Sequence, residues 1–284
     1  RELARLWFDQ LTAVWTEIAE LLDFPDGKEE VPSAIDLLMG LLFMILALRL
    51  NGDEVVAALV RGRDVRTAWK LDRAPLSAAE RVAPAGKKAS ATRERIIASA
   101  IELLMEEGPG AVTYPAVARR AGLTTAAPAY HFKSIDAILS AAQISMFENS
   151  KTRYRAAMAG ADLSALDEDG LIDLTTVICL RESTEFSKQS VASYSIWLEA
   201  ARHPELRPMV AAAINDQHHA WSRLFARING EEDSLTAILA PCLYLGKLVR
   251  LLATGAPTAD LTTIRRTFQR DLGAMIADTH WFQG

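Results

Sequence analysis

Apolar residues recur at helical spacing along almost the whole chain, and this pattern limits what it can fold into. Glycine and proline interrupt the pattern, and the β-branched runs typical of buried strands are scarce. The helical segments expected outside a central window are 3–22, 32–50, 53–71, 134–158, 171–182, 187–202, 208–228, 234–254 and 259–279. The sequence therefore predicts an all-α protein.

A linker divides this helical chain. At 284 residues the chain exceeds the roughly 250 residues at which single cores stop growing, so two or three units are expected. Residues 72–92 are rich in Ala, Pro, Ser and charge and have no apolar period, which is typical of a linker. Fully extended, this stretch would span about 70 Å. We therefore expect a three-helix unit at 1–71 and a separate unit after residue 92.

The charge of the chain is unevenly distributed. Half of the residues are apolar and 24% are charged, as in soluble globular proteins, and the net charge is −5. Residues 87–133 carry seven basic and four acidic side chains, so this window is +3 and the remainder is −8. A basic module on an acidic body suits a specific nucleic-acid binder, because attraction to phosphates is local.

Residues 93–133 have the pattern of a helix-turn-helix. A first helix, with apolar residues on one face, ends at Gly108-Pro109-Gly110; Thr113 is expected to cap a second helix. Gly122 permits a tight turn, and Thr124 is expected to cap a third helix. In such a motif the last helix lies in the major groove of DNA, where small residues let the backbone approach the bases.

The same window resembles the signature of the TetR family over about 50 residues. The resemblance lies in the TxxxVAxxAGLT run from Thr113 to Thr124, the triplet Tyr130-His131-Phe132, and Lys133-Ser134. Ala126, Pro128 and Ala129 depart from it, since many members have Gly, a bulky apolar residue and an aromatic residue there. The resemblance implies a three-helix DNA-binding head at 93–133, followed by a helical ligand-binding and dimerisation body at 134–284.

Residues predicted to meet DNA lie on or beside the third helix, or where neighbouring helices begin. They are Lys87, Lys88, Arg93, Thr113, Tyr114, Thr124, Thr125, Ala127, Tyr130, His131 and Lys133. The resemblance assigns phosphate contacts to Thr113, Tyr130 and Lys133, while the pair His131-Phe132 ends the third helix and packs the head. For Tyr130 and His131 the alternative is packing inside the head, and for Lys87 and Lys88 it is a solvated linker.

The resemblance also implies a chamber in the body for a small apolar effector, without a cofactor. Candidate lining residues are apolar or aromatic with a few polar groups: Ile178, Cys179, Phe186, Tyr194, Trp197, Met209, Trp221 and Tyr244. For each of them, packing in the core is the alternative, because helical bundles need the same residue types.

The first unit reads as a partial repeat of the last three helices. Residues 14–18 resemble 220–224, and in each copy an apolar helix follows, ends at a glycine (Gly52 or Gly255), and leads to a helix with an arginine pair. Those pairs are Arg63 with Arg66 and Arg265 with Arg266. In the family, the corresponding long helices form a four-helix bundle between two subunits. We therefore expect an intramolecular pseudo-dimer or a homodimer, with a second head upstream of Arg1 or absent; the alternative is that any two amphipathic helix triplets look alike.

The sequence favours the cytoplasm and no membrane. Cys179 and Cys242 lie inside apolar helical patterns, which suits a reducing compartment. The apolar run 37–48 is closed by Asp36 and Arg49 after twelve residues, short of the roughly 18 to 20 that span a bilayer. A signal peptide pattern is not present at the start of the sequence.

Catalysis finds little support in the sequence. His203, His218 and His219 lack partners at metal-ligand spacing, and GxGxxG, GxxxxGK and GxSxG are absent, so we expect neither a catalytic nor a metal site. We expect a sequence-specific transcriptional regulator of TetR type, a repressor responsive to a small apolar ligand. The alternative is a helical interaction protein whose head no longer reads DNA.

Overall fold

The structure, a computed structural model, describes residues 1–24, 27–61, 69, 87–158, 166–230, 235–255 and 261–277. Across these ranges every regular element is helical, which confirms the all-α prediction. The long helices are α1 (Glu2–Leu21), α2 (Gly27–Leu48), α3 (Gly52–Arg61), α5 (Lys87–Glu107), α8 (Ile135–Met158), α9 (Glu168–Ser183), α10 (Ser187–Glu199), α11 (Arg207–Asn229), α12 (Leu235–Thr254) and α13 (Leu261–Ala277). Shorter elements are η1 (Pro109–Ala111), α6 (Tyr114–Ala121), α7 (Ala127–His131) and η3 (Pro204–Leu206).

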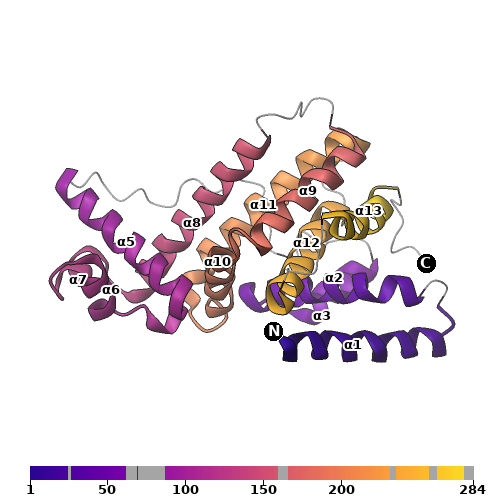
Figure 1. The fold of residues 1–284 in the computed structure, drawn as a ribbon, viewed down its shortest axis with the longest axis horizontal. Coiled ribbons are helices and arrows are strands. Elements are labelled where there is room, and N and C mark those ends of the chain that lie inside the picture. The colour runs from indigo at the N-terminus through magenta and orange to yellow at the C-terminus, as the bar shows by residue number, and fades with distance from the viewer. Residues whose placement is uncertain are drawn as a thin grey trace.

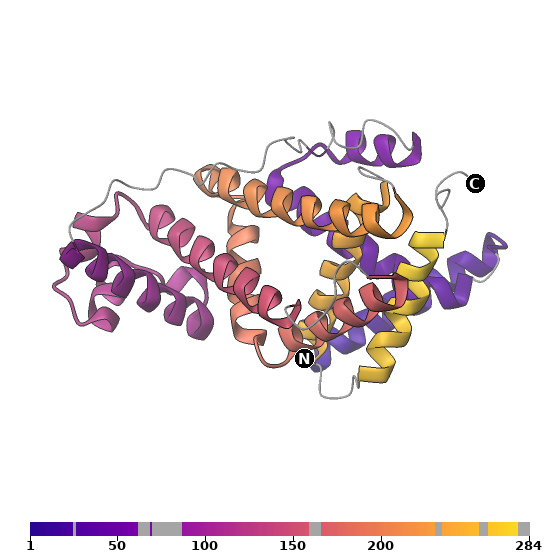
Figure 2. The same cartoon turned by 90° about the horizontal axis from the view of Figure 1, so that it is seen from above.

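A head and a body lie at opposite ends of the molecule. Helices α5, α6 and α7 form the head at one end, and α1, α2, α12 and α13 lie at the other (Figure 1). The view from above shows the same separation (Figure 2). Helix α8 joins the two, because Ile138 and Leu139 near its start are buried with the head residue Ile96 and Met146 is buried farther along.

The contact between α2 and α12 is the most extensive helix–helix contact among the described residues. It is close because a methyl group on Gly40 would overlap the backbone carbonyl of Cys242, and one on Gly246 would overlap that of Asp36. Helix α1 packs on α2 and α12, and α11 packs on α12 and α2. These four helices form a bundle that joins the first unit to the last part of the chain.

Two helices, Glu30–Leu48 and Leu235–Thr254, are long and apolar enough to cross a membrane by length and composition alone. The helix that contains the apolar run 37–48 begins at Gly27, five residues before the predicted start at residue 32, and ends at Leu48, two residues before the predicted end. Half of the first window and 61% of the second are buried, and the two helices pack on each other. Both therefore have the surroundings of core helices.

The end of α2 differs from the prediction that Gly52 closes this helix. Helix α2 ends at Leu48, and Arg49 takes the left-handed conformation with φ 53°. The side chain of Asn51 caps α3, because its Oδ1 accepts hydrogen bonds from the backbone N–H groups of Asp53 (3.1 Å) and Glu54 (3.4 Å). Asparagine is among the strongest N-caps, and α3 accordingly begins at Gly52, one residue before the predicted start at residue 53.

The predicted linker also ends earlier than expected. Helix α5 begins at Lys87, so the last six residues of 72–92 are helical. The rest of that stretch, together with Arg63 and Arg66, lies outside the described residues. Glycine ends helices where the sequence predicted it, at Gly108 (φ 84°), Gly122 (φ 62°) and Gly255 (φ 84°), and also at Gly230 (φ 78°).

Candidate functional site

In the corner between α6 and α7, the cap of α6 and the turn that follows it form as the sequence predicts. Thr113 is the N-cap of α6, and its hydroxyl oxygen accepts a hydrogen bond from the backbone N–H of Ala116 (3.3 Å). Gly122 then adopts the left-handed conformation, which places the N–H of Leu123 against the carbonyl of Ala118 (2.9 Å). The buried residues Val117, Ala118 and Ala121 hold α6 on the head.

The second side of the corner differs from the prediction that Thr124 caps the third helix. Helix α7 begins at Ala127, its N-cap position is Ala126, and no side chain caps it. The carbonyl of Thr124 instead accepts a hydrogen bond from the N–H of Ala127 in the preceding turn (2.9 Å). The reason is Pro128, which has no N–H and fits best in the first turn of a helix, where that group has no partner within the helix.

The outer face of this corner is exposed. Thr124, Thr125, Ala126 and Ala129 are exposed, and the side chain of Tyr130 is 87% exposed. Ala127 is half-buried, while Pro128 and Phe132 are buried against the head. Small side chains on an outward-facing short helix are the geometry that lets a backbone approach base edges in a groove.

Two residues predicted to meet DNA instead hold the end of α7. Arg93 donates a hydrogen bond to the carbonyl of His131 (3.0 Å), and its guanidinium lies 4.0 Å from the centre of the Phe132 ring. Burial lowers the pKa of Arg93 below its ordinary value. The hydroxyl of Tyr114 donates to the carbonyl of Phe132 (3.1 Å). The polar groups of Arg93 and Tyr114 are therefore engaged inside the head.

The other predicted residues divide by position. Thr113 and Lys133 are exposed beside the corner, and the half-buried ring of His131 lies edge-on to Tyr130 at 5.3 Å. Lys87 and Lys88 begin α5, with side chains outside the described residues. Sequence analysis missed Arg119, an exposed cation in the last turn of α6. The two adjacent arginines were the available signal in the sequence. Arg120, however, pairs with Glu106 (2.8 Å), and only the fold distinguishes Arg120 from Arg119.

A cavity of about 40 Å³ lies in the body between α8, α9, α10 and α11. Its lining residues are Met146, Phe147, Ser150, Glu182, Gln189, Ser190, Ser193, Tyr194, Trp197 and Gln217. The aromatic rings of Tyr194 and Trp197 meet edge-on at 5.2 Å, and Phe43 of α2 meets Tyr194 edge-on at 5.9 Å. The first unit of the chain therefore touches the wall of this cavity.

The cavity has a buried acidic group that sequence analysis missed. Glu182 is 5% exposed, and its carboxylate accepts hydrogen bonds from Arg153 (3.0 Å) and Ser190 (2.5 Å). The guanidinium of Arg153 also lies 4.0 Å from the centre of the Phe186 ring. The Oε1 atom of Gln189 is buried and has no hydrogen-bond partner among the described residues. The lining is therefore both aromatic and polar.

Of the eight predicted chamber residues, Tyr194 and Trp197 line this cavity. Phe186 does not line it, but its ring lies against Arg153, which pairs with the lining residue Glu182. The other five do not line it. Cys179 is fully buried, and burial raises the pKa of its thiol to about 12. Trp221 stacks on Phe225 and Tyr244 on Phe268, while Met209 packs against the core and Ile178 is half-buried. Four of these five, Cys179, Met209, Trp221 and Tyr244, therefore have the contacts of core residues.

The fold brings acidic groups to His203 that the sequence did not reveal. Its Nδ1 lies 3.2 Å from a carboxylate oxygen of Asp136, and its Nε2 lies 3.6 Å from Glu199. Asp136, His203 and Glu205 could together hold a metal ion, although they are only partly buried or exposed. These contacts already account for the arrangement, because they link α8 to the end of α10.

Comparison with known families agrees with this head and body. Residues 96–142 match the family model described as bacterial regulatory proteins, tetR family. Residues 166–275 match the model described as tetracyclin repressor-like, C-terminal domain. No curated protein sequence matches the chain.

Several solved structures share the fold. A proposed transcriptional regulator from Streptomyces coelicolor A3(2) is 21% identical with a TM-score of 0.53, over 63% of this chain and 96% of its own. The multidrug binding protein EbrR, solved with imidazole, is 22% identical with a TM-score of 0.54, over 67% and 95%. A proposed transcriptional regulator from Saccharomonospora viridis, solved with choline, is 18% identical with a TM-score of 0.55, over 65% and 96%.

An exposed helix-turn-helix on a helical body defines a DNA-binding transcriptional regulator, and both family models match the corresponding parts of the chain. The chain belongs to the TetR family of bacterial regulators.

Proposed function

We propose that this regulator is a repressor that reads a specific operator with the exposed corner of its head and leaves it when a small molecule fills the body cavity. The observation that carries the proposal is the outward face of α7, where Thr125 and Ala129 are exposed beside a turn fixed by Gly122. Repression follows if the operator overlaps a promoter.

The residues of the corner take different roles in this proposal. The hydroxyls of Thr124 and Thr125 hydrogen-bond to base edges, and the methyl of Ala129 contacts thymine methyls. Tyr130 and Lys133 contact phosphates and set the position of the head. Arg93 and Tyr114 keep α7 in place without touching DNA, as their contacts to the carbonyls of His131 and Phe132 support.

Selection of binding sites from a random library of DNA duplexes tests this function. The full chain should enrich one sequence motif. Thr125→Glu should abolish the enrichment, because a carboxylate would face the bases and phosphates. Thr262→Glu is the matched control, since Thr262 is exposed on α13 in the body. Failure to enrich any motif would instead favour the helical interaction protein with a degenerate head.

We infer that the effector is a small molecule with a flat or apolar part and a positively charged or hydrogen-bond-donating group, rather than a purely apolar one. The buried carboxylate of Glu182 and the unpaired Oε1 of Gln189 support the polar part, and Tyr194 and Trp197 support the apolar part. Imidazole and choline, bound to the two related structures, have this chemistry. A cation in the cavity would compete with Arg153 for Glu182.

Helix α8 offers the route from this cavity to the head. Met146 and Phe147 line the cavity, while Ile138 and Leu139, two turns earlier, are buried with the head core. A ligand that needs more room than the cavity now has would move α8 or its neighbours, and with α8 the head. Such coupling requires the effector to bind one arrangement more tightly than the other.

Release of DNA by choline and by imidazole tests the proposed effector site. At least one of them should weaken binding to the selected DNA and raise the melting temperature of the free protein. Glu182→Gln should reduce both responses to choline. Glu185→Gln is the control, because Glu185 pairs with Arg181 on the exposed end of the same helix (2.9 Å). Equal choline responses in both variants would contradict the role of Glu182.

We also propose that 1–71 and the last three helices are two copies of one unit that pair within the chain as a pseudo-dimer, joined by 72–92 to the head at 93–133 and the body at 134–284. An offset of 206 positions aligns Trp15 with Trp221, and Gly40 with Gly246. It also aligns Arg49 with Gly255, and both take a left-handed φ after equivalent helices. Arg49, and not the predicted Gly52, is thus the counterpart of Gly255.

The contact between α2 and α12 supports this pairing. The same offset makes Asp36 the counterpart of Cys242 and Gly40 that of Gly246. Gly40 packs on Cys242 and Gly246 packs on Asp36, so each contact is the symmetry-related copy of the other, as in a two-fold interface. We expect a mass of one chain, 31.1 kDa, in solution; twice this mass would favour the homodimer. DNA binding and two buried free thiols support a place in the cytoplasm.

A further inference from the structure

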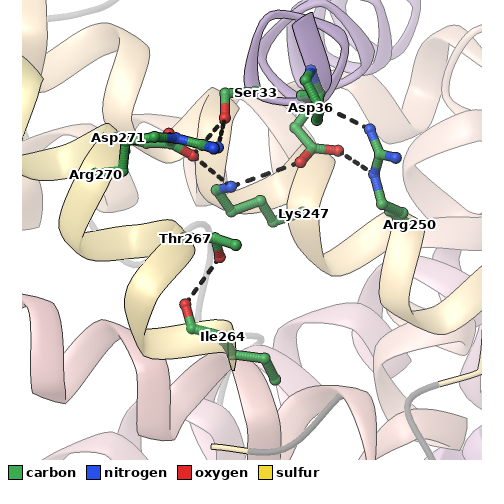
Figure 3. Close-up of polar contacts among 9 residues, drawn as sticks. Ser33, Asp36, Lys247, Arg250, Ile264, Thr267, Arg270 and Asp271 are labelled. Atoms are coloured by element: carbon green, nitrogen blue, oxygen red, sulfur yellow. Dashed lines mark hydrogen bonds and ion pairs between the residues drawn. The ribbon is translucent and has the colours of Figure 1, made fainter. Parts of the chain in front are cut away.

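A buried cluster of charged residues joins α2 to α12 and α13 (Figure 3). Ser33 and Asp36 come from α2, Lys247 and Arg250 from α12, and Arg270 and Asp271 from α13. The exposed fractions of Asp36, Lys247 and Asp271 are 4%, 6% and 4%. Charged groups this deeply buried are costly unless each has partners.

The cations of this cluster bridge the carboxylates of different helices. Arg250 donates from Nε to a carboxylate oxygen of Asp36 (2.7 Å). The ammonium of Lys247 lies between two carboxylates, 3.6 Å from Asp36 and 2.5 Å from Asp271 (Figure 3). Burial raises the pKa of Asp36 although Lys247 and Arg250 lower it, so this carboxylate depends on both cations to stay charged.

Asp271 is held on its other side as well. The hydroxyl of Ser33 donates to one carboxylate oxygen (2.7 Å), and Arg270 donates to the other (2.7 Å). Burial acts to raise the pKa of Asp271, but the charge of Lys247 and these hydrogen bonds bring it below the ordinary value. The cluster therefore links one helix of the first unit to two helices of the last.

The proposed two-fold relation does not repeat this charged cluster. With the offset of 206, the counterpart of Asp36 is Cys242, that of Lys247 is Leu41, and that of Arg250 is Met44. Cys242 and Met44 are buried in the apolar core, against which Leu41 packs. In both halves of the α2–α12 contact the backbones therefore lie close together, but only one half carries charged side chains.

We propose that the ion pairs of Asp36 with Lys247 and Arg250 select the pairing of α2 with α12 and exclude pairing of either helix with its copy in a second chain. This inference rests on the proposed pseudo-dimer. If α12 paired with a second α12, Cys242 would stand where Asp36 now stands, and Arg250 would lose that carboxylate. If α2 paired with a second α2, Asp36 would lose both cations.

These buried charges affect which helices pair more than they affect the total stability of the fold. A buried ion pair often contributes no more to stability than apolar residues of similar volume, but removal of one partner leaves a buried charge and destabilises strongly. A single buried polar residue can likewise fix the partner choice of a coiled coil. Here every pairing would bury the apolar surface, but only the pairing of α2 with α12 gives Asp36 and Arg250 their partners.

Charge reversal in the full chain tests the proposal. Asp36→Arg and Arg250→Asp should each lower the melting temperature, because each brings like charges together. The variant with both substitutions in one chain should recover a higher melting temperature than either single variant and a mass of one chain. If the single variants fold poorly, the double variant still decides, since failure to recover would overturn the proposal.

A mixture of the two single variants, unfolded and refolded together, gives the second measurement. The substituted α2 of one chain would then match the substituted α12 of the other, and the unsubstituted pair would match as well. The mixture should therefore form a species of twice the mass of one chain, which neither variant forms alone. A mixture that remains at the mass of one chain would overturn the proposal.

Arg265→Asp with Asp173→Arg is the matched control. These residues form an exposed pair at 2.6 Å between α13 and α9, so reversal there should leave the mass and the mixing behaviour unchanged. The wild-type mass separates the two proposals. A wild type of twice the mass would contradict the pseudo-dimer itself, whereas a single-chain wild type with indifferent variants would contradict the charge selection alone.

Discussion

Single residues of the head illustrate how similar side chains serve different purposes. The sequence predicts DNA contacts for both Tyr114 and Tyr130. In the structure, the hydroxyl of Tyr114 donates to the carbonyl of Phe132, whereas the side chain of Tyr130 is 87% exposed. Arg93 likewise holds the carbonyl of His131. The residue types predicted functional roles for these side chains, but the direction in which each side chain points depends on how α5 and α6 pack.

Replacement of each tyrosine by phenylalanine separates the two roles. Tyr114→Phe should lower the free energy of unfolding by about 1 kcal/mol, because it leaves the carbonyl of Phe132 without this donor. Tyr130→Phe should leave stability within about 0.5 kcal/mol and weaken DNA binding, since an exposed hydroxyl is lost. Denaturant unfolding and titration with the selected DNA measure both. Equal stability losses in the two variants would contradict the assignment.

At the scale of elements, the crossing of α2 and α12 depends on two glycines. Gly40 and Gly246 let the backbones approach until there is no room for a methyl group beside the facing carbonyls of Cys242 and Asp36. Backbone atoms cannot move aside as the end of a flexible side chain can, so any larger residue must separate the helices.

Gly40→Ala and Gly246→Ala should therefore each destabilise the protein by about 1 to 3 kcal/mol, the usual range for overpacking. Gly52→Ala is the control, because a methyl group there meets nothing within 4 Å and Gly52 lies in the first turn of α3. Its effect should be close to zero. Chemical denaturation of the three variants measures this difference, and a Gly40→Ala variant as stable as wild type would show that the helices do not cross this closely.

The elements also mark the limit of what the sequence could predict. The capping of α6 by Thr113 and the turn at Gly122 were predictable because both depend on residues a few positions apart. The start of α7 was predicted two residues too early, because the effect of Pro128 on the first turn outweighed the capping preference of Thr124. The Asp36–Arg250 pair joins residues 214 positions apart, and no local pattern reveals such a contact.

At the scale of the whole molecule, the head, the cavity and the bundle form one connected path. Helix α8 leaves the head and lines the cavity, and Phe43 of the first unit touches the cavity through Tyr194. The related structures match about two thirds of this chain over nearly their whole lengths, which leaves about a third of it without a counterpart. In the proposed pseudo-dimer, the first unit at 1–71 supplies the bundle helices that a second subunit would otherwise bring.

The dependence of DNA affinity on salt concentration shows whether the corner around Gly122 is the part of the protein that binds DNA. On the selected site, the affinity of Lys133→Ala should be weaker, and the slope of its logarithm against the logarithm of salt concentration should be shallower than that of wild type by about 0.9, the value for one phosphate contact. Lys188→Ala, exposed on α10, should keep the wild-type slope. Identical slopes for wild type and Lys133→Ala would contradict the account.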